Sequence, residues 1–119
     1  APAVLIKAGV ETAISLGRGR FSASMARNLS HAAAHAARHG LTTEQAIQAI
    51  TRAPAKILGV EDKVGIIVKG GIATLIATDG PLLDVRSSVR QMWIAGISVS
   101  LENRQTRLYR RYQQRPKLK

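Results

Sequence analysis

The hydrophobic residues of the first part of the chain follow helical and extended patterns in turn. Apolar residues occupy most of positions 4–8 ahead of Gly9, which predicts a short helix. Polar and apolar residues then alternate over positions 10–16, which predicts a strand. The alanine-rich segment 22–39 stops at Gly40 and predicts one long helix.

Two shorter helix signals follow. Thr42 stands three residues before Gln45, the spacing of a capping box, and hydrophobic residues recur after it at helical intervals. Pro54 favours a further short turn of helix that ends at Gly59. The first sixty residues therefore predict an α/β arrangement.

Beyond Val60 the hydrophobic runs become shorter and richer in β-branched residues. They predict three strands, at residues 64–68, 72–78 and 89–94. Ala95-Gly96 is placed to form a hairpin turn leading into residues 97–99. The last stretch, residues 103–114, predicts a helix.

Composition narrows the classes of protein to consider. The 119 residues hold 18 Lys and Arg against 7 Asp and Glu, a net charge of +11, so the chain attracts polyanions. Four aromatic residues offer little stacking surface for bases, which favours contact with a phosphate backbone. The absence of cysteine excludes disulfides and thiolate metal sites. No apolar run is long enough to cross a bilayer, so we expect a soluble chain without a membrane partner, and favour the cytoplasm.

Three histidines form the first candidate site. His31, His35 and His39 are spaced by four residues, which places them along one face of the predicted helix, where two imidazoles could bind a transition metal. No carboxylate lies nearby in the sequence to complete the coordination. The alternative is a row of solvated or packing histidines on a surface helix.

Arginines form two candidate anion sites. Arg18 and Arg20 alternate with glycines between the predicted strand and helix, where backbone N–H groups and guanidinium groups could hold a phosphate. The alternative is a flexible loop. Arg104, Arg107 and Arg111 would line one side of the last helix, a basic stripe suited to a phosphate backbone or an acidic partner. A solvated, frayed terminus is the alternative there.

Three stretches of the sequence carry motifs that occur together in one enzyme family. They are residues 5–17, residues 39–60 with Thr-Arg-Ala-Pro-Ala-Lys-Ile-Leu-Gly at 51–59, and residues 64–96 with Asp-Gly-Pro-Leu at 79–82. In this order they resemble the C-terminal portion of metal-dependent amidohydrolases of the imidazolonepropionase-like group. Residues 101–109 resemble the tail of some members, so the likeness covers nearly all of the chain.

The resemblance implies a fold that passes from α/β to α+β. Its parts would be the last strand and helices of a TIM-like barrel at 1–60, short antiparallel β strands at 61–102 and a basic C-terminal helix or tail at 103–119. It also implies a parent enzyme that hydrolyses amide or cyclic C–N bonds with zinc or another divalent metal. The family's catalytic Asp after strand eight would fall at Arg18 or Gly19, so the resemblance assigns no catalytic residue and no cofactor to this chain.

These observations favour a non-catalytic structural or interaction module derived from an amidohydrolase. A barrel segment exposes apolar surface, so we expect a homo-oligomer or a complex with a complementary fragment. One alternative is a fragment that hydrolyses its substrate only together with a missing metal-binding portion. The other is a basic accessory protein that binds nucleic acid or another polyanion.

Overall fold

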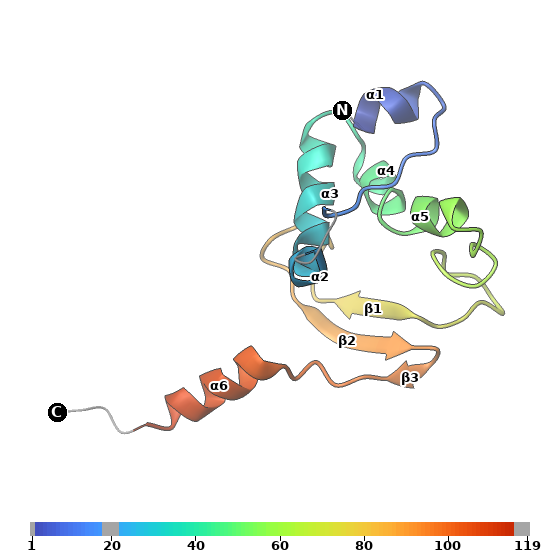
Figure 1. Ribbon diagram of the computed structural model, residues 1–119. Coiled ribbons are helices and arrows are strands. Elements are labelled where there is room, and N and C mark those ends of the chain that lie inside the picture. The colour runs from blue at the N-terminus through green and yellow to red at the C-terminus, as the bar shows by residue number, and fades with distance from the viewer. Residues whose placement is uncertain (1, 18–21, 116–119) are drawn as a thin grey trace.

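A computed structural model describes residues 2–17 and 22–115 (Figure 1). The helices of this part of the chain are α1 (Pro2–Lys7), α2 (Ser22–Met25), the 3₁₀ helix η1 (Ala26–Asn28), α3 (Leu29–Arg38), α4 (Thr43–Gln48), α5 (Arg52–Ile57) and α6 (Arg104–Gln113). The strands are β1 (Leu75–Thr78), β2 (Val89–Ile94) and β3 (Ile97–Ser98). None of these helices is long and apolar enough to cross a membrane.

Helix α4 begins and α5 ends where their cap residues predict, whereas α5 begins at Arg52, two residues before the Pro54 predicted to open it. Thr42 accepts a hydrogen bond at its side chain from the Gln45 backbone N–H (3.1 Å), and the Gln45 side chain accepts one from the Thr42 backbone N–H (2.9 Å). This reciprocal capping box starts α4. Gly59 follows α5 with a φ of +68°, the left-handed conformation that closes many helices.

The single helix predicted for residues 22–39 is wrong, because the segment is divided into α2, η1 and α3. Asn28 has left the helical region, with φ −94° and ψ 7°. Asn and Ser side chains compete for backbone hydrogen bonds, so the Asn28–Ser30 stretch is a weak place in an otherwise alanine-rich helix.

The strand predicted for residues 10–16 is also absent from the structure. A strand needs a neighbour for its ladder of hydrogen bonds, and the backbone here bonds to helices instead. The Ile14 N–H donates to the Ala49 carbonyl (2.8 Å), and the Val10 N–H donates to the Leu5 carbonyl (3.0 Å). The side chains of residues 11–16 keep the predicted alternation between exposed and half-buried positions, but the segment has no strand partner among the described residues.

The β-rich segment contains one antiparallel sheet in the order β1-β2-β3. Leu75 is opposite Trp93 and Ile94 is opposite Ile97, and Ala95 and Gly96 have φ angles of +50° and +81°. Positive φ at both turn residues is the signature of a type I′ turn, so the predicted hairpin is confirmed. Residues 64–68 form no strand, because they belong to a loop whose ends are held by a hydrogen bond from the Ile72 N–H to the Lys63 carbonyl (3.3 Å). Residues 72–78 contribute only β1.

The core is small and made almost wholly of alanine. Its main cluster joins α1, α3 and α4 through Ala3, Ala33, Ala36, Leu41 and Ala46, with Ile6, Ile14, Ala37, Ile50 and Leu83 packed against it. Alanines allow the helices to approach closely but bury little apolar area each. In the described part of the chain no large side chain is fully buried.

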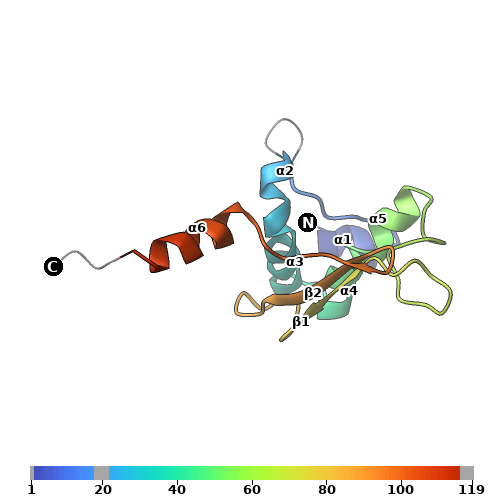
Figure 2. The same ribbon diagram turned by 90° about the horizontal axis from the view of Figure 1, so that it is seen from below.

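The last helix lies apart from the rest of the molecule. In Figures 1 and 2, which differ by a quarter turn, α6 extends away from both the helices and the sheet. The radius of gyration is 17.3 Å, whereas a compact domain of this length has one of about 13.5 Å. The helix predicted at residues 103–114 is confirmed as α6. It projects into solvent, which agrees with the large radius of gyration.

Candidate functional site

His31 and His35 lie on α3, and His39 follows the helix directly as its C-cap residue. The rings of His35 and His39 are stacked at 4.3 Å between centroids, tilted by 31°. His39 Nδ1 lies 2.8 Å from the His35 carbonyl oxygen, so this nitrogen donates to the backbone of its own helix. All three side chains are on the exposed side of the helix. Helix geometry therefore accounts for the position of the histidines without a ligand.

We tested whether these residues suit the divalent metal that the family resemblance implies. Within residues 2–17 and 22–115, no three His, Asp or Glu side chains gather closely enough to hold a metal ion. Two stacked imidazoles supply fewer ligands than the three or four side chains of the usual protein zinc sites. The donor set of the described residues does not fit a catalytic metal.

Of the two predicted arginine sites, the structure describes only the one on the last helix. Arg18 and Arg20 lie outside the described residues, so the proposed phosphate loop is not placed. Arg104, Arg107 and Arg111 lie on α6, and their side chains are exposed without an ion pair in the described part of the chain.

Two other arginines in and just after α6 make contacts within the chain. Arg110 Nη1 lies 3.0 Å from Glu102 Oε1, and the Arg115 guanidinium stacks over the Tyr112 ring at 4.4 Å. These contacts leave the three arginines of the predicted stripe as the free positive charges of the helix.

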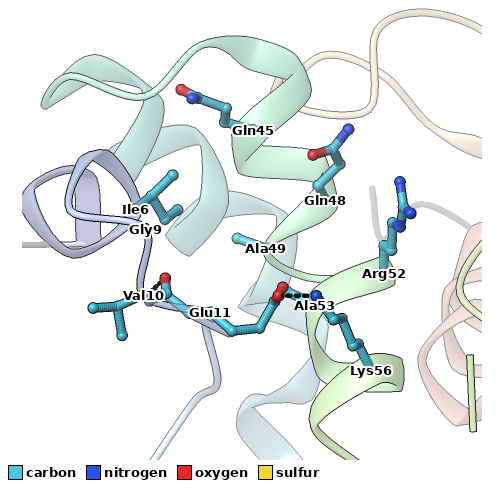
Figure 3. Close-up of a pocket in the computed structure, with 11 residues that line it drawn as sticks. Ile6, Gly9, Val10, Glu11, Gln45, Gln48, Ala49, Arg52, Ala53 and Lys56 are labelled. Carbon is cyan, nitrogen blue, oxygen red and sulfur yellow. Dashed lines mark hydrogen bonds and ion pairs between the residues drawn. The ribbon is translucent and has the colours of Figure 1, made fainter. Parts of the chain in front are cut away.

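A pocket of about 270 Å³ lies between the start of the chain and the helices α4 and α5 (Figure 3). Ile6, Gly9, Val10, Glu11 and Thr12 line one side. The other side is formed by Gln45, Gln48, Ala49, Arg52, Ala53 and Lys56. The pocket thus combines a small apolar floor with polar side chains from two helices.

One ion pair crosses this pocket. Lys56 Nζ lies 2.6 Å from Glu11 Oε2, and Figure 3 shows the contact spanning from the first segment to α5. The hydrogen bond to Glu11, together with its charge, raises the pKa of the Lys56 ammonium. Both side chains are about half exposed, so the pair contributes little to stability.

Sequence reasoning missed this pocket. Glu11 and Lys56 stand 45 residues apart and belong to no shared motif. The only available signal is that Glu11 is the sole acidic residue before Glu44. The lining offers two amides, the Glu11–Lys56 pair and the guanidinium of Arg52 but no histidine. Its one hydroxyl, that of Thr12, donates to the Val10 carbonyl. The pocket can hold a polar group but contains no nucleophile with an adjacent base.

Asp79 and Asp84 bind backbone and side-chain groups of the β-rich segment. Asp79 accepts a hydrogen bond from the Ser88 backbone N–H (2.7 Å) and pairs with Arg90 (2.6 Å). The Ser88 bond is the main cause that lowers the pKa of Asp79. Asp84 accepts from the side chain and backbone N–H of Arg86, in that order of effect, and its pKa is lowered to about 2. Both carboxylates are therefore ionised anchors and not proton donors at neutral pH.

The chain is similar to amidohydrolases both in sequence and in structure. Residues 5–106 match the family model described as the amidohydrolase family. A solved structure, the amidohydrolase from Thermotoga maritima MSB8, superposes with a TM-score of 0.73 and 33% sequence identity. That match covers 81% of this chain and 24% of the solved chain.

The match covers most of this chain but only a small part of the solved structure. The chain spans about a quarter of the length of the solved structure, so most of that fold has no counterpart in these 119 residues. No curated protein is similar enough in sequence to count as a relative.

Proposed function

The chain belongs to the amidohydrolase family, and we propose that it is a non-catalytic structural module which works by associating with further protein surface. The observation that carries this proposal is the apolar surface that the fold leaves open. The buried residues of the described part are seven alanines and Leu41. Larger apolar residues, among them Ile67 and Ile97, are more than two thirds exposed.

The accessible area supports the same conclusion. The chain exposes 9756 Å², whereas a compact monomer of 12.8 kDa exposes about 6,300 Å². A standard protein interface removes about 800 Å² from each partner, so the excess is ample for one or more interfaces. Large apolar side chains contribute to this accessible surface, among them Leu58, Ile67 and Ile97, each more than two thirds exposed.

The available donor groups support a non-catalytic role. Amidohydrolase chemistry, as the resemblance implies it, needs a metal-activated water and a carboxylate after strand eight. Arg18 and Gly19 occupy that position in the sequence, and a cation there would oppose the binding of a metal. In the described ranges Asp79 and Asp84 already pair with arginines, and the histidines lie on α3 and at its C-cap.

Self-association is the form of assembly that the open surface favours. The loop at residues 66–72 presents Ile66, Ile67, Val68 and Ile72, and its residues also line an apolar hollow of about 210 Å³. In the described sheet, β1 and β3 are the edge strands, and β1 is the longer of the two with four residues, so it offers more unpaired backbone groups to a second strand. A second copy brings the same apolar loop and edge, which suits a symmetric contact.

Light scattering coupled to elemental analysis tests the proposal on the purified chain. We expect a dimer or larger species without stoichiometric zinc, and no hydrolysis of amide or cyclic C–N substrates in the presence of added zinc. A monomer that unfolds cooperatively would contradict the assembly role. Metal-dependent hydrolysis by the chain alone would contradict the non-catalytic role.

A second candidate is a part of an enzyme that becomes active with a complementary portion. The observation in its favour is the 24% share of the Thermotoga maritima structure that the chain covers. The remainder of such a fold would have to supply the metal ligands. This candidate requires a stable complex between the chain and a polypeptide carrying those ligands, and zinc-dependent hydrolysis that appears only on mixing.

A further inference from the structure

Helix α6 is a charged element that the proposed assembly role does not use. Its ten residues contain four arginines and no acid. Its side chains are exposed apart from the half-buried Thr106, and in Figures 1 and 2 it stands clear of the body. An isolated helix shorter than about 12 residues is marginal in water, so a partner surface would stabilise it.

The arginines of α6 fall into two groups. Arg110 is held by Glu102, whereas Arg104, Arg107 and Arg111 have no acidic partner in the described part of the chain. At about 100° per residue these three lie within about 60° of one another around the helix, and about 10 Å apart along it from first to last. We call these three residues the α6 stripe.

The α6 stripe suits a linear polyanion better than a lipid surface or an acidic protein groove. The only apolar side chains on the helix are Leu108 and the rings of Tyr109 and Tyr112, too few to anchor it in a bilayer interface or a hydrophobic groove. Arginine makes bidentate contacts to phosphate oxygens. The net charge of +11 adds attraction over the whole chain.

The state of the tyrosines favours a duplex over a single strand. Single-stranded nucleic acids bind by stacking their bases on aromatic rings. The Tyr112 ring is already covered by the Arg115 guanidinium, and the Tyr109 hydroxyl accepts a hydrogen bond from the Gln113 side chain (2.7 Å). One face of the Tyr112 ring and the Tyr109 hydroxyl are thus engaged within the chain, whereas the three arginines of the α6 stripe have no acidic partner among the described residues.

The size of the helix favours DNA over RNA. An α-helix is about 10–12 Å wide and the major groove of B-form DNA is about 12 Å wide. The major groove of an RNA duplex is too deep and narrow to admit it. We propose that α6 docks on double-helical DNA, with Arg104, Arg107 and Arg111 contacting its phosphate backbone without reading base sequence.

Fluorescence anisotropy with a labelled DNA duplex tests this inference on the full chain. The test variant is R104Q/R107Q/R111Q, in which glutamine preserves helix propensity. The matched control is R38Q/K63Q/K69Q, which removes the same number of charges from exposed positions elsewhere. Measurements between 50 and 200 mM salt report the number of phosphate contacts.

We expect the test variant to bind at least about tenfold more weakly, and its salt dependence to fall by about 2.7 in log Kd against log salt. The control should remain within about twofold of the native chain, with the same salt dependence. R104K/R107K/R111K retains the charges and should recover most of the binding, which separates loss of contact from loss of fold. Circular dichroism checks the helix in each variant.

Three results would overturn the inference. Equal losses in the test and control variants would mean that binding follows net charge alone. Single-stranded DNA or duplex RNA binding as tightly as the DNA duplex would contradict the assigned partner. Displacement of the duplex by polyglutamate at equal charge concentration would point to an acidic protein instead.

Discussion

Gly65 is a residue at which the fold leaves no room for a larger side chain. Its φ is +95°, and an added Cβ would lie 2.6 Å from the Ala55 Cβ and 2.9 Å from the Thr51 carbonyl oxygen. We expect Gly65→Ala to lower the free energy of unfolding by about 2–4 kcal/mol, because it adds both backbone strain and overpacking. Urea denaturation measures the change.

Gly70→Ala is the control for backbone strain alone. Gly70 has a similar φ of +87°, but no atom lies within 4 Å of the added Cβ. This variant should lose only about 1 kcal/mol. Equal losses in the two variants would show that the contact with α5 is not close in solution.

Asp84 should make the free energy of unfolding depend on pH in the acidic range. Its pKa is about 2 in the folded chain against 3.8 for the free side chain, because Arg86 donates side-chain and backbone hydrogen bonds to it. The unfolded chain therefore takes up this proton first as the pH falls, so the stabilisation is complete above about pH 4 and is lost toward pH 2. Asp84→Asn should flatten the decline of stability over this range.

Denaturation measured at pH 5, 4, 3 and 2 checks the role of Asp84. Asp62→Asn is the control, because Asp62 has no ion pair within the described residues. It should follow the native decline. An Asp84→Asn curve parallel to the native one would contradict the assignment.

At the scale of elements, side-chain capping boxes support α4 and α6, which bury few large side chains. In α4 the capping box of Thr42 and Gln45 satisfies two backbone N–H groups that would otherwise lack partners. Thr42→Ala should reduce the free energy of unfolding by about 1 kcal/mol, measured by urea denaturation. Thr42→Ser keeps the acceptor oxygen and should be close to native.

Thr43→Ala is the second control for this cap. Thr43 is the first helical residue of α4 and contributes no hydrogen bond to the cap. Because alanine favours helix more than threonine does, this change should be neutral or slightly stabilising. A loss as large as that of Thr42→Ala would mean that helix propensity, and not capping, limits α4.

At the scale of the whole molecule, the apolar loop at residues 66–72 should govern association. Ile67 is 89% exposed, the most exposed of the large apolar residues in the described ranges. Ile67→Lys should shift the chain toward smaller species in light scattering, because a charge cannot be buried in an apolar contact. Its stability per chain should change little, since only about a tenth of Ile67 is covered by the rest of the chain.

Val85→Lys is the matched control for that change. Val85 is also highly exposed, at 77%, but lies between the charged Asp84 and Arg86, away from the apolar loop. This variant should keep the native mass in solution. Equal dissociation by both variants would indicate that added charge alone opposes assembly.

Local sequence patterns predicted the elements whose hydrogen bonds join residues only a few positions apart. The Thr42 capping box, the Ala95-Gly96 turn and the helix at residues 104–113 need only neighbours in sequence, so their residues predicted them. The strand expected at residues 10–16 failed because a ladder needs a second strand that local pattern cannot supply. The family resemblance was visible for the same reason as the helices, since its motifs are continuous runs of sequence.

The sequence by itself determined the charge, the membership of the amidohydrolase family and the spacing of the arginines on the last helix. Each depends on residue identity at spacings that a helix or motif sets. Only the tertiary structure decided that Glu11 meets Lys56, that alanines alone fill most of the core, and that α6 and the apolar loop stand open. Such facts depend on how distant segments pack, and packing is a property of the whole chain in space.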